Sequence, residues 1–325
     1  MTEVTPVDVL SAAKRIRPFI DRTPFEESRP LSERSGARVF LKMENLQRTG
    51  SFKARGAFSF VTAMSDDARA KGVLAVSSGN HAQGVAWAAG EFGLDAVIVM
   101  PENTPATKIE ATRRYGARVV LAGGNFDEAD RIATEMAAES GRTFVSAFAD
   151  RHVIAGQGTI GLEMMLARPD LDAIIVPTGG GGALCGIACV AKALNPRIRV
   201  YGVQSEASCP WYHSFREGRP VEAKVFDSLA EGLSNAAVPE YMFNMGKRWV
   251  DGILTVTEEE IAGAMFWMMR EHHMIIEGSA AVSVAVLLSH RLRLEGKTAG
   301  ALLTGGNVDV ARVKMIAASE GRLSA

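Results

Sequence analysis

The chain has 325 residues, of which 47% are hydrophobic and 22% charged, and its formal net charge is −1. This length suits about two globular domains, and the balanced charge excludes the strongly basic surfaces with which proteins bind nucleic acids or anionic membranes. No apolar run approaches the ~18 residues of a membrane-spanning helix. The first ten residues lack the apolar segment of a signal peptide.

Cysteine and histidine usage gives no metal site. The three cysteines, Cys185, Cys189 and Cys209, form no CxxC pair, and the six histidines do not gather near them. A zinc site needs more ligands than this. A low, odd number of cysteines is typical of a reducing compartment. We therefore expect a cytoplasmic protein without a bound metal.

The first 70 residues are predicted to be mainly helical. Apolar spacing and turn residues predict, in chain order, a helix over 7–17, a helix over 31–35, a strand over 39–43 and a helix over 54–63. Pro18 ends the first of these helices and Gly36 the second. The last helix is expected to fade at Ser65.

From Gly72 onward, short β runs alternate with helices. The predicted elements are strand 73–76, helix 82–92, strand 96–100, helix 107–115, strand 117–121, helix 126–140 and strand 143–145. Four strands alternating with three helices predict a parallel sheet covered by helices on both faces.

A second alternating series begins at Val153. Its predicted elements are helix 153–167, strand 173–177, helix 183–194, strand 199–203, strand 253–256, helix 258–272, helix 280–288 and strand 299–303. Strands that could complete a larger sheet thus flank the smaller unit. We predict an α/β fold of two three-layer αβα domains with mainly parallel sheets, in which a small domain (71–148) is inserted in a large one (1–70 and 149–325).

Lys53 lies in the stretch TGSFKARGA, where Ser51 is a suitable N-cap for the helix that follows. A lysine in the first turn meets the positive end of the helix dipole, which favours its neutral amine. A neutral lysine amine is a nucleophile that forms Schiff bases with aldehydes. The alternative for any single lysine is a solvated surface side chain.

The strongest signal for a ligand is the glycine loop, Gly179–Gly182, which joins an apolar strand to a helix. Free N–H groups at such a helix start bind anions, and glycines let a phosphate approach closely. Neither the Walker pattern nor GxGxxG fits these residues. The alternative is a turn whose glycines only permit tight packing.

Two further strand ends carry small polar residues. The serine loop, Ser77–His81, has the same strand–loop–helix layout and would suit a carboxylate, although an ordinary N-cap is the alternative. Thr304 precedes Gly305-Gly306-Asn307 at the end of another strand. Because parallel strands end at one edge of a sheet, these groups would meet there. Pyridoxal 5′-phosphate carrying an amino acid has matching parts: phosphate, carboxylate, ring nitrogen and aldehyde.

These motifs together resemble the fold-type II pyridoxal-phosphate enzymes, specifically the serine/threonine dehydratase group, which includes serine racemase. The matching stretches, in the order typical of that group, are TGSFKARGA, SSGNHAQGVA, AGQGTIGLE, PTGGGGAL, VQSE and TGGNVD. They extend from Thr49 to Asp309 and so cover most of the chain. The resemblance implies the tryptophan synthase β-like fold and pyridoxal 5′-phosphate as the cofactor.

The resemblance also implies a role for individual residues. Lys53 would bind the cofactor covalently and act as the base for the Cα proton. The other implied contacts are Phe52 with the cofactor ring, Asn80 with its 3-hydroxyl, Thr304 with its nitrogen, Gly179, Gly180, Gly181, Gly182 and Ala183 with its phosphate, and Ser77, Ser78, Gly79, Asn80 and His81 with the substrate carboxylate.

The implied reaction is an α,β-elimination from L-threonine or L-serine that gives a 2-keto acid and ammonia, in a homodimer or homotetramer. The cofactor phosphate would protonate the leaving hydroxyl. A hydroxyl at the ring nitrogen, in place of a carboxylate, makes the ring a weaker electron sink and favours elimination over transamination. A non-catalytic phosphate-binding protein is the alternative from another class, but binding alone does not need Lys53.

Three positions bear on the substrate and on racemisation. Gly278 stands where the group has a proline, which suggests a larger or acidic β-hydroxy amino acid as an alternative substrate. Ser78 matches the second base of the racemases, so an amino-acid racemase is a further alternative. Gln204 stands where racemases carry an acidic metal ligand, so we expect no divalent-cation site.

Overall fold

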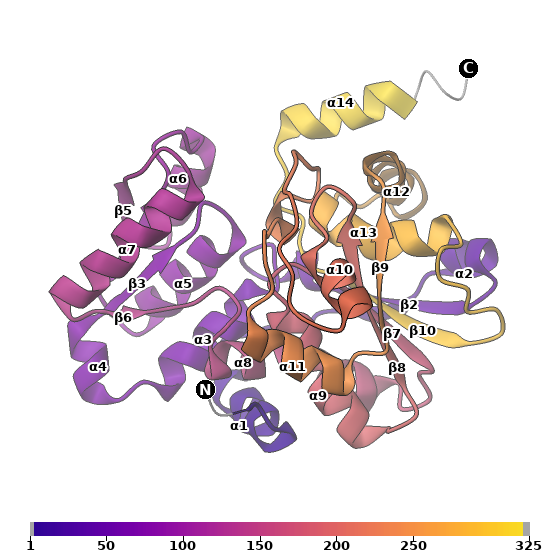
Figure 1. The fold of residues 1–325 in the computed structure, drawn as a ribbon, viewed down its shortest axis with the longest axis horizontal. Helices are drawn as coiled ribbons and strands as arrows, with labels where there is room; N and C mark the ends of the chain where they lie inside the picture. The colour runs from indigo at the N-terminus through magenta and orange to yellow at the C-terminus, as the bar shows by residue number, and fades with distance from the viewer. Residues whose placement is uncertain (1–2, 321–325) are drawn as a thin grey trace.

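The structure is a computed structural model that describes residues 3–320, and it consists of two lobes, each built on its own sheet (Figure 1). The strands are β1 (Phe25–Glu27), β2 (Arg38–Met43), β3 (Val73–Val76), β4 (Ala96–Met100), β5 (Arg118–Leu121), β6 (Thr143–Phe144), β7 (Ala173–Pro177), β8 (Arg199–Ser205), β9 (Gly252–Val256) and β10 (Thr298–Leu303). None of the helices within the described range is long and apolar enough to cross a membrane.

Helices connect nearly all of these strands. They are α1 (Pro6–Ile16), α2 (Arg29–Ser35), α3 (Lys53–Ala63), α4 (Asp66–Lys71), α5 (Asn80–Glu91), α6 (Ala106–Arg113), α7 (Phe126–Ser140), α8 (Arg151–Ala167), α9 (Gly182–Leu194), α10 (Pro210–Glu217), α11 (Glu240–Trp249), α12 (Glu258–His272), α13 (Gly278–Leu288) and α14 (Val310–Glu320), with 3₁₀ turns η1 (Glu44–Leu46) and η2 (Glu231–Leu233).

The larger lobe contains a six-stranded sheet in the order β1-β2-β10-β7-β8-β9, in which only β1 is antiparallel to its neighbour. Alternate residues of β7 enter different cores: Ile174 and Val176 pack with α8 and α9, whereas Ala173 and Ile175 pack with α12 and α13. Apolar side chains therefore cover both faces of the sheet, as expected for parallel strands.

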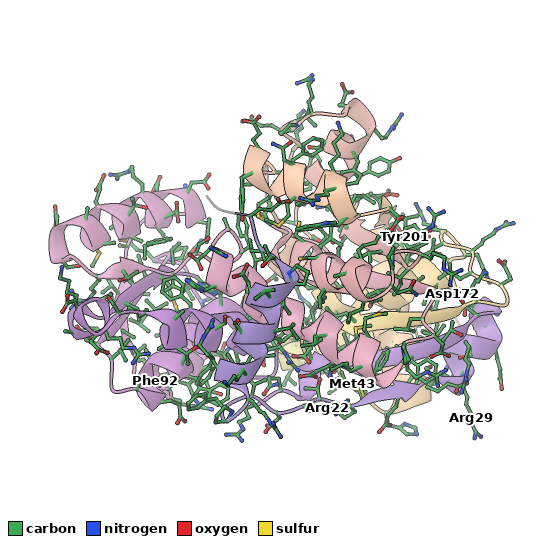
Figure 2. The ribbon with its side chains drawn as sticks, turned by 90° about the horizontal axis from the view of Figure 1, so that it is seen from below. Arg22, Arg29, Met43, Phe92, Asp172 and Tyr201 are labelled. Carbon is green, nitrogen blue, oxygen red and sulfur yellow. The ribbon has the colours of Figure 1, made fainter. Side chains whose placement is uncertain are left out.

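The smaller lobe contains a parallel four-stranded sheet in the order β5-β4-β3-β6. Helix α7 covers one face and α5 the other. This lobe is drawn in purple and magenta at the left of Figure 1. Figure 2 labels Phe92 in this lobe and Tyr201 and Asp172 in the larger one. The predicted α/β class with mainly parallel sheets is confirmed.

Helix α3 packs into both lobes and lies between them in Figure 1. Phe58 belongs to the same core as Val73 of the small sheet, while Gly56 closely approaches Val153 of α8. The hydrophobic core of the smaller lobe therefore extends beyond residues 71–148. The domain boundaries given by the sequence stay a prediction.

Most predicted helices and strands are confirmed to within one to three residues at each end. The predicted end of the helix over 54–63 is confirmed, since α3 ends at Ala63, but the sequence analysis missed the short helix α4 that follows, which Ser65 caps by accepting from the amide of Ala68. Sequence patterns left β1, α10, α11 and α14 unassigned. Of these, α10 and α11 hold Trp211 and Met242 in the large core, so tertiary burial determines them.

Candidate active site

Strands of both sheets direct their carboxyl ends to the junction of the two lobes. From the larger sheet come Lys53 after β2, the glycine loop after β7 and Thr304 after β10. From the smaller sheet come the serine loop after β3 and the segment after β6. Contacts at this junction bring together residues that lie more than 200 positions apart in sequence.

Lys53 is the first residue of α3, as predicted, and its Nζ donates to the carbonyl of Ala147 at 2.9 Å. Its ammonium also lies 5.3 Å from the centroid of the Phe52 ring. Burial lowers the pKa of Lys53 from 10.5 to about 8, and the carboxylate of Glu277 opposes this fall. A large fraction of the amine is therefore neutral and nucleophilic near pH 8.

The predicted N-cap of α3 is wrong. Phe52 occupies the N-cap position and no side chain caps the helix. Ser51 pairs with Gly305 in a β-bridge, which draws it toward the end of β10, and its buried hydroxyl has no partner among the described residues. The amide of Phe52 donates to the carbonyl of Thr304 at 3.0 Å, so the chain ahead of Lys53 is tied to β10.

A buried ion network fixes α3 two residues after the lysine. The Arg55 guanidinium donates to Glu44 at 2.8 and 2.9 Å and to Glu163 of α8 at 2.7 Å. Lys42 of β2 donates to Glu163 at 2.6 Å. Removing one member would leave a buried charge unpaired, which typically costs about 3–5 kcal/mol. The network therefore holds the start of α3 against β2 and α8.

The glycine loop passes very close to two aromatic rings. A Cβ at Gly180 would lie 2.2 Å from the Phe148 ring, and one at Gly181 would lie 2.2 Å from the Trp211 ring. Gly181 also has φ of +92°, a conformation that favours glycine. Tight packing, the alternative stated from the sequence, thus applies to these two positions. Phosphate binding by Gly179–Gly182 and by Ala183 of α9 stays a prediction.

Thr304 provides a direct test of whether a pyridoxal cofactor suits this site. The residue is only 2% exposed, and its Oγ1 has no hydrogen-bond partner among the described residues. A buried hydroxyl without a partner is costly, and a ring nitrogen is a suitable partner. With the amine of Lys53 and the glycine loop at neighbouring strand ends, the residues present fit the cofactor.

The serine loop is more open than the glycine loop. The Ser77 hydroxyl accepts from the amide of Gly79 at 3.1 Å, which shapes the turn ahead of α5. The Ser78 side chain is partly exposed and forms no hydrogen bond within the described residues. A Cβ at Gly79 would meet no atom within 4 Å. Space for a ligand therefore remains beside this loop.

The ring of His81 points away from the predicted carboxylate site. Its Nε2 lies 2.9 Å from the carbonyl of Val145, and the residue is only 3% exposed. Burial, with a smaller effect of the Lys53 charge, lowers the pKa of His81 from 6.5 to about 3, so the ring is neutral. Any contact of His81 with a carboxylate would have to come from its backbone amide.

Asn80 takes part in a polar network that spans both lobes. Its Nδ2 donates to the two carboxylate oxygens of Glu277 at 2.9 and 3.1 Å. Asn307 donates to the Asn80 Oδ1 at 2.8 Å and to the carbonyl of Thr49 at 2.8 Å. Sequence reasoning gave no role to Glu277, Asn307, Phe148 or Trp211, because each acts through contacts distant in sequence.

Gln204 forms neutral hydrogen bonds where a metal ligand was considered. Its Nε2 donates to the carbonyl of Thr178, directly before the glycine loop, at 3.1 Å, and its Oε1 accepts from the amide of Tyr212 at 3.1 Å. The side chain is fully buried. Both ends of the amide therefore have partners in the protein, and these hydrogen bonds connect β8, α10 and the start of the glycine loop.

Comparison with known proteins places the chain in a family. The family model described as pyridoxal-phosphate dependent enzyme matches residues 16–305. The chain is 42% identical over 313 residues to an L-threonine ammonia-lyase of Thermotoga maritima, covering 96% of this chain and 78% of the relative. It is 44% identical over 310 residues to a catabolic L-threonine dehydratase of Staphylococcus aureus, covering 94% and 90%.

A solved structure gives the same result for the fold. The crystal structure of serine racemase from Dictyostelium discoideum superposes with a TM-score of 0.89 at 35% identity, covering 94% of this chain and 99% of that one. The protein belongs to the family of pyridoxal-phosphate-dependent enzymes and has their fold type II. Pyridoxal 5′-phosphate is its cofactor, as the sequence predicted.

Proposed function

We propose that this protein is an ammonia-lyase that converts L-threonine, and L-serine as a second substrate, to a 2-keto acid and ammonia. The observation that carries the proposal is the amine of Lys53, which is partly buried at the junction of the two lobes and has a pKa near 8. Relatives that are 42–44% identical and are named for threonine ammonia-lyase or dehydratase activity support the substrate class.

Pyridoxal phosphate, when bound through Lys53, supplies the electron sink that makes the Cα proton of the amino acid acidic. The role of Lys53 is then to accept that proton at Nζ, for which its lowered pKa suits it. The β-hydroxyl would take up a proton and leave as water, and the released enamine would then take up one water to give ammonia and the keto acid. In the net reaction, threonine gives 2-oxobutanoate and ammonia.

The protein would orient the cofactor and the substrate. Thr304 would accept or donate at the cofactor nitrogen, and the glycine loop would hold the phosphate. Backbone amides of the serine loop, at the start of α5, would hold the substrate carboxylate. Phe148 lies against the glycine loop, one residue after the carbonyl that Lys53 contacts, and would exclude water on that side.

Racemisation is a second candidate function because Ser78 is partly exposed and its hydroxyl has no hydrogen-bond partner among the described residues. Racemisation needs a base on each face of the planar intermediate, and Ser78 would be the second base. The serine racemase fold likeness supports this candidate. Gln204, which forms only neutral hydrogen bonds, weighs against a cation-dependent racemase, so we propose that elimination dominates.

Close packing against a neighbouring segment explains Gly278 without an unusual substrate. A Cβ at this position would lie 2.1 Å from the carbonyl oxygen of Leu229, so the backbone of a neighbouring segment requires a glycine here. A proline would overlap the same carbonyl. The alternative of a larger or acidic β-hydroxy amino acid therefore loses the observation that motivated it, and threonine is the first substrate to test.

The test is a keto-acid assay over a panel of β-hydroxy amino acids, with borohydride reduction and peptide mapping of the holoenzyme. We expect L-threonine to give the highest kcat/KM and the reduced cofactor to label Lys53. Lys53→Ala should lose the absorbance band of the lysine-linked cofactor and all but about 0.1% of the activity. Label on another lysine, or no keto acid from any substrate, would refute the proposal.

We also propose that the protein is a cytoplasmic homodimer or homotetramer. Its three cysteines are free and buried, which suits a reducing compartment. Several large apolar side chains are exposed, among them Leu166, Phe226 and Val310. Light scattering over a range of protein concentrations tests the assembly. A mass of one chain at every concentration would contradict it.

A further inference from the structure

We propose that Glu277 is a positioning residue for the lyase reaction: its carboxylate fixes the Asn80 amide and, without a direct ion pair among the described residues, keeps a negative charge in the surroundings of Lys53. The inference rests on the proposed function, because it concerns the residues assigned to cofactor binding. Glu277 and Asn80 lie 197 positions apart in sequence and come from different lobes. Their contact is thus specific to the assembled site.

The Glu277 side chain is not used by its own helix. Glu277 is the N-cap residue of α13, yet its side chain makes no capping hydrogen bond. Only its carbonyl serves the helix, accepting from the amides of Ala280 and Ala281. Ser, Thr, Asp and Asn are the usual side chains at an N-cap. Helix capping therefore does not account for a glutamate here, and its carboxylate turns toward Asn80.

The network leaves Asn80 a single orientation. Its Nδ2 faces the Glu277 carboxylate and its Oδ1 faces the Nδ2 of Asn307. With the amide reversed, the Asn80 oxygen would oppose the carboxylate and its NH₂ would oppose the NH₂ of Asn307. Both contacts would be repulsive. Glu277 thus determines which atom Asn80 presents to a bound ligand.

Gly305, after the end of β10, leaves room for the Glu277 carboxylate because it has no side chain. A Cβ at Gly305 would lie 2.6 Å from the Glu277 Oε1, so any larger residue would displace the side chain. The amide of Glu277 donates to the Gly305 carbonyl at 3.1 Å, which fixes the backbone beside the gap. Gly305 directly follows Thr304. The carboxylate therefore lies beside two of the segments assigned to the cofactor, that of Asn80 and that of Thr304.

Charged groups from three other elements face Glu277. Burial raises its pKa from 4.5 to about 7, the Asn80 bond and the Lys53 and Lys108 charges lower it, and Glu231 of η2 raises it. Above pH 7 the carboxylate is mainly ionised and stabilises the ammonium of Lys53. Neutralising it should therefore lower the pKa of Lys53, since only burial would then act on the amine.

The test uses cofactor-free protein, in which the pH dependence of Lys53 acetylation is followed by peptide mass. We expect an apparent pKa near 8 in the wild type, a fall of about one unit in Glu277→Gln, and a smaller fall in Glu277→Asp, which keeps the charge. Glu231→Gln is the matched control: Glu231 pairs with Lys108 and Arg312 and raises the pKa of Glu277, so its removal leaves Glu277 ionised and the pKa of Lys53 should not fall.

A Lys53 titration that is the same in Glu277→Gln and the wild type would overturn the proposal. Should Glu277→Gln fail to fold, the Asp variant and Asn80→Ala provide a second measurement. In urea unfolding, the Glu277→Asp and Asn80→Ala shifts of the midpoint should be less than additive, and full additivity would also overturn the proposal. Keto-acid production by the wild type tests the proposed function separately, because the titration involves no substrate.

Discussion

The glycine loop and the serine loop have the same layout, but their glycines are required for different reasons. Each loop joins a buried parallel strand to a helix and consists mainly of small residues. At Gly180 and Gly181, a Cβ would enter the rings of Phe148 and Trp211. At Gly79, a Cβ would meet no atom within 4 Å. Side chains of the protein pack against the glycine loop, whereas the serine loop leaves space beside Gly79 in which a ligand can bind.

The same sequence pattern of strand, small residues and helix can therefore serve either close packing within the protein or space for a ligand. A packed glycine loop is already shaped before a ligand arrives, which reduces the ordering cost of binding. An open serine loop can adjust to the amino acid. Substitutions that add one methyl group to each loop separate these two roles, because a packed site loses stability and an open site loses affinity.

Gly181→Ala should have the largest effect. The added Cβ meets the Trp211 ring at 2.2 Å, and φ of +92° is unfavourable for alanine. Overpacking and backbone strain together should cost about 3 kcal/mol or more of unfolding free energy. Urea unfolding of cofactor-free protein measures this loss. A loss below about 1 kcal/mol would mean that the loop is not tightly packed.

The second prediction concerns pH, because the serine loop contains a titratable side chain, His81, and the glycine loop contains none. The folded pKa of about 3 lies below the ordinary 6.5, so between these values the unfolded chain binds a proton that the folded chain does not. The contribution of His81 to stability is therefore complete above pH 6.5 and decreases as the pH falls.

The expected slope from His81 is at most about 1.4 kcal/mol per pH unit below pH 6. Urea unfolding at pH 7, 6 and 5 should show a steeper loss in the wild type than in His81→Gln, which retains a side chain able to donate to Val145. Equal slopes in the two proteins would mean that the ring is not held neutral.

Gly79→Ala should change stability little, within about 0.5 kcal/mol, because the methyl group enters open space. The same methyl group would crowd a substrate carboxylate. We expect KM for L-threonine to rise about tenfold, which corresponds to 1.4 kcal/mol. Steady-state kinetics beside urea unfolding measures both effects. An unchanged KM would place the carboxylate elsewhere.

Ser78→Ala should have the smallest effect on elimination. The hydroxyl has no partner among the described residues, so its loss should leave keto-acid production within about threefold and stability within about 0.5 kcal/mol. Any D-serine formed from L-serine should disappear, as chiral chromatography would show. Equal loss of both products would mean that Ser78 positions the carboxylate and is not a second base.

The sequence was sufficient for the features that depend on local pattern. Apolar runs located β3, β4 and β7, and the small residues after them located the loops. The position of Lys53 at the start of α3 was also predictable, because the loop residues before it and the apolar spacing after it are local signals, even though the predicted cap was wrong.

What the sequence could not supply are contacts that depend on the assembled lobes. Ser51 is a plausible cap by residue type, but pairing with Gly305 across the sheet removes it from the helix. The partnership of Glu277 with Asn80 and the approach of Phe148 to Gly180 have no local signature. Glycines in the sequence also could not show whether a loop is packed by neighbouring side chains, as at Gly180, or is open to a ligand, as at Gly79.

The position of α3 in both cores has a consequence for motion. Gly84 of α5 lies against the backbone of Lys53 and Ala54, and the Phe58 ring of α3 packs edge-on against Trp87 of α5, with ring centroids 4.6 Å apart. On the other side, Arg55 of α3 is held by the buried ions of the larger lobe. Movement of one lobe against the other would therefore disturb buried contacts of α3, and Lys53, the first residue of this helix, is held by both lobes.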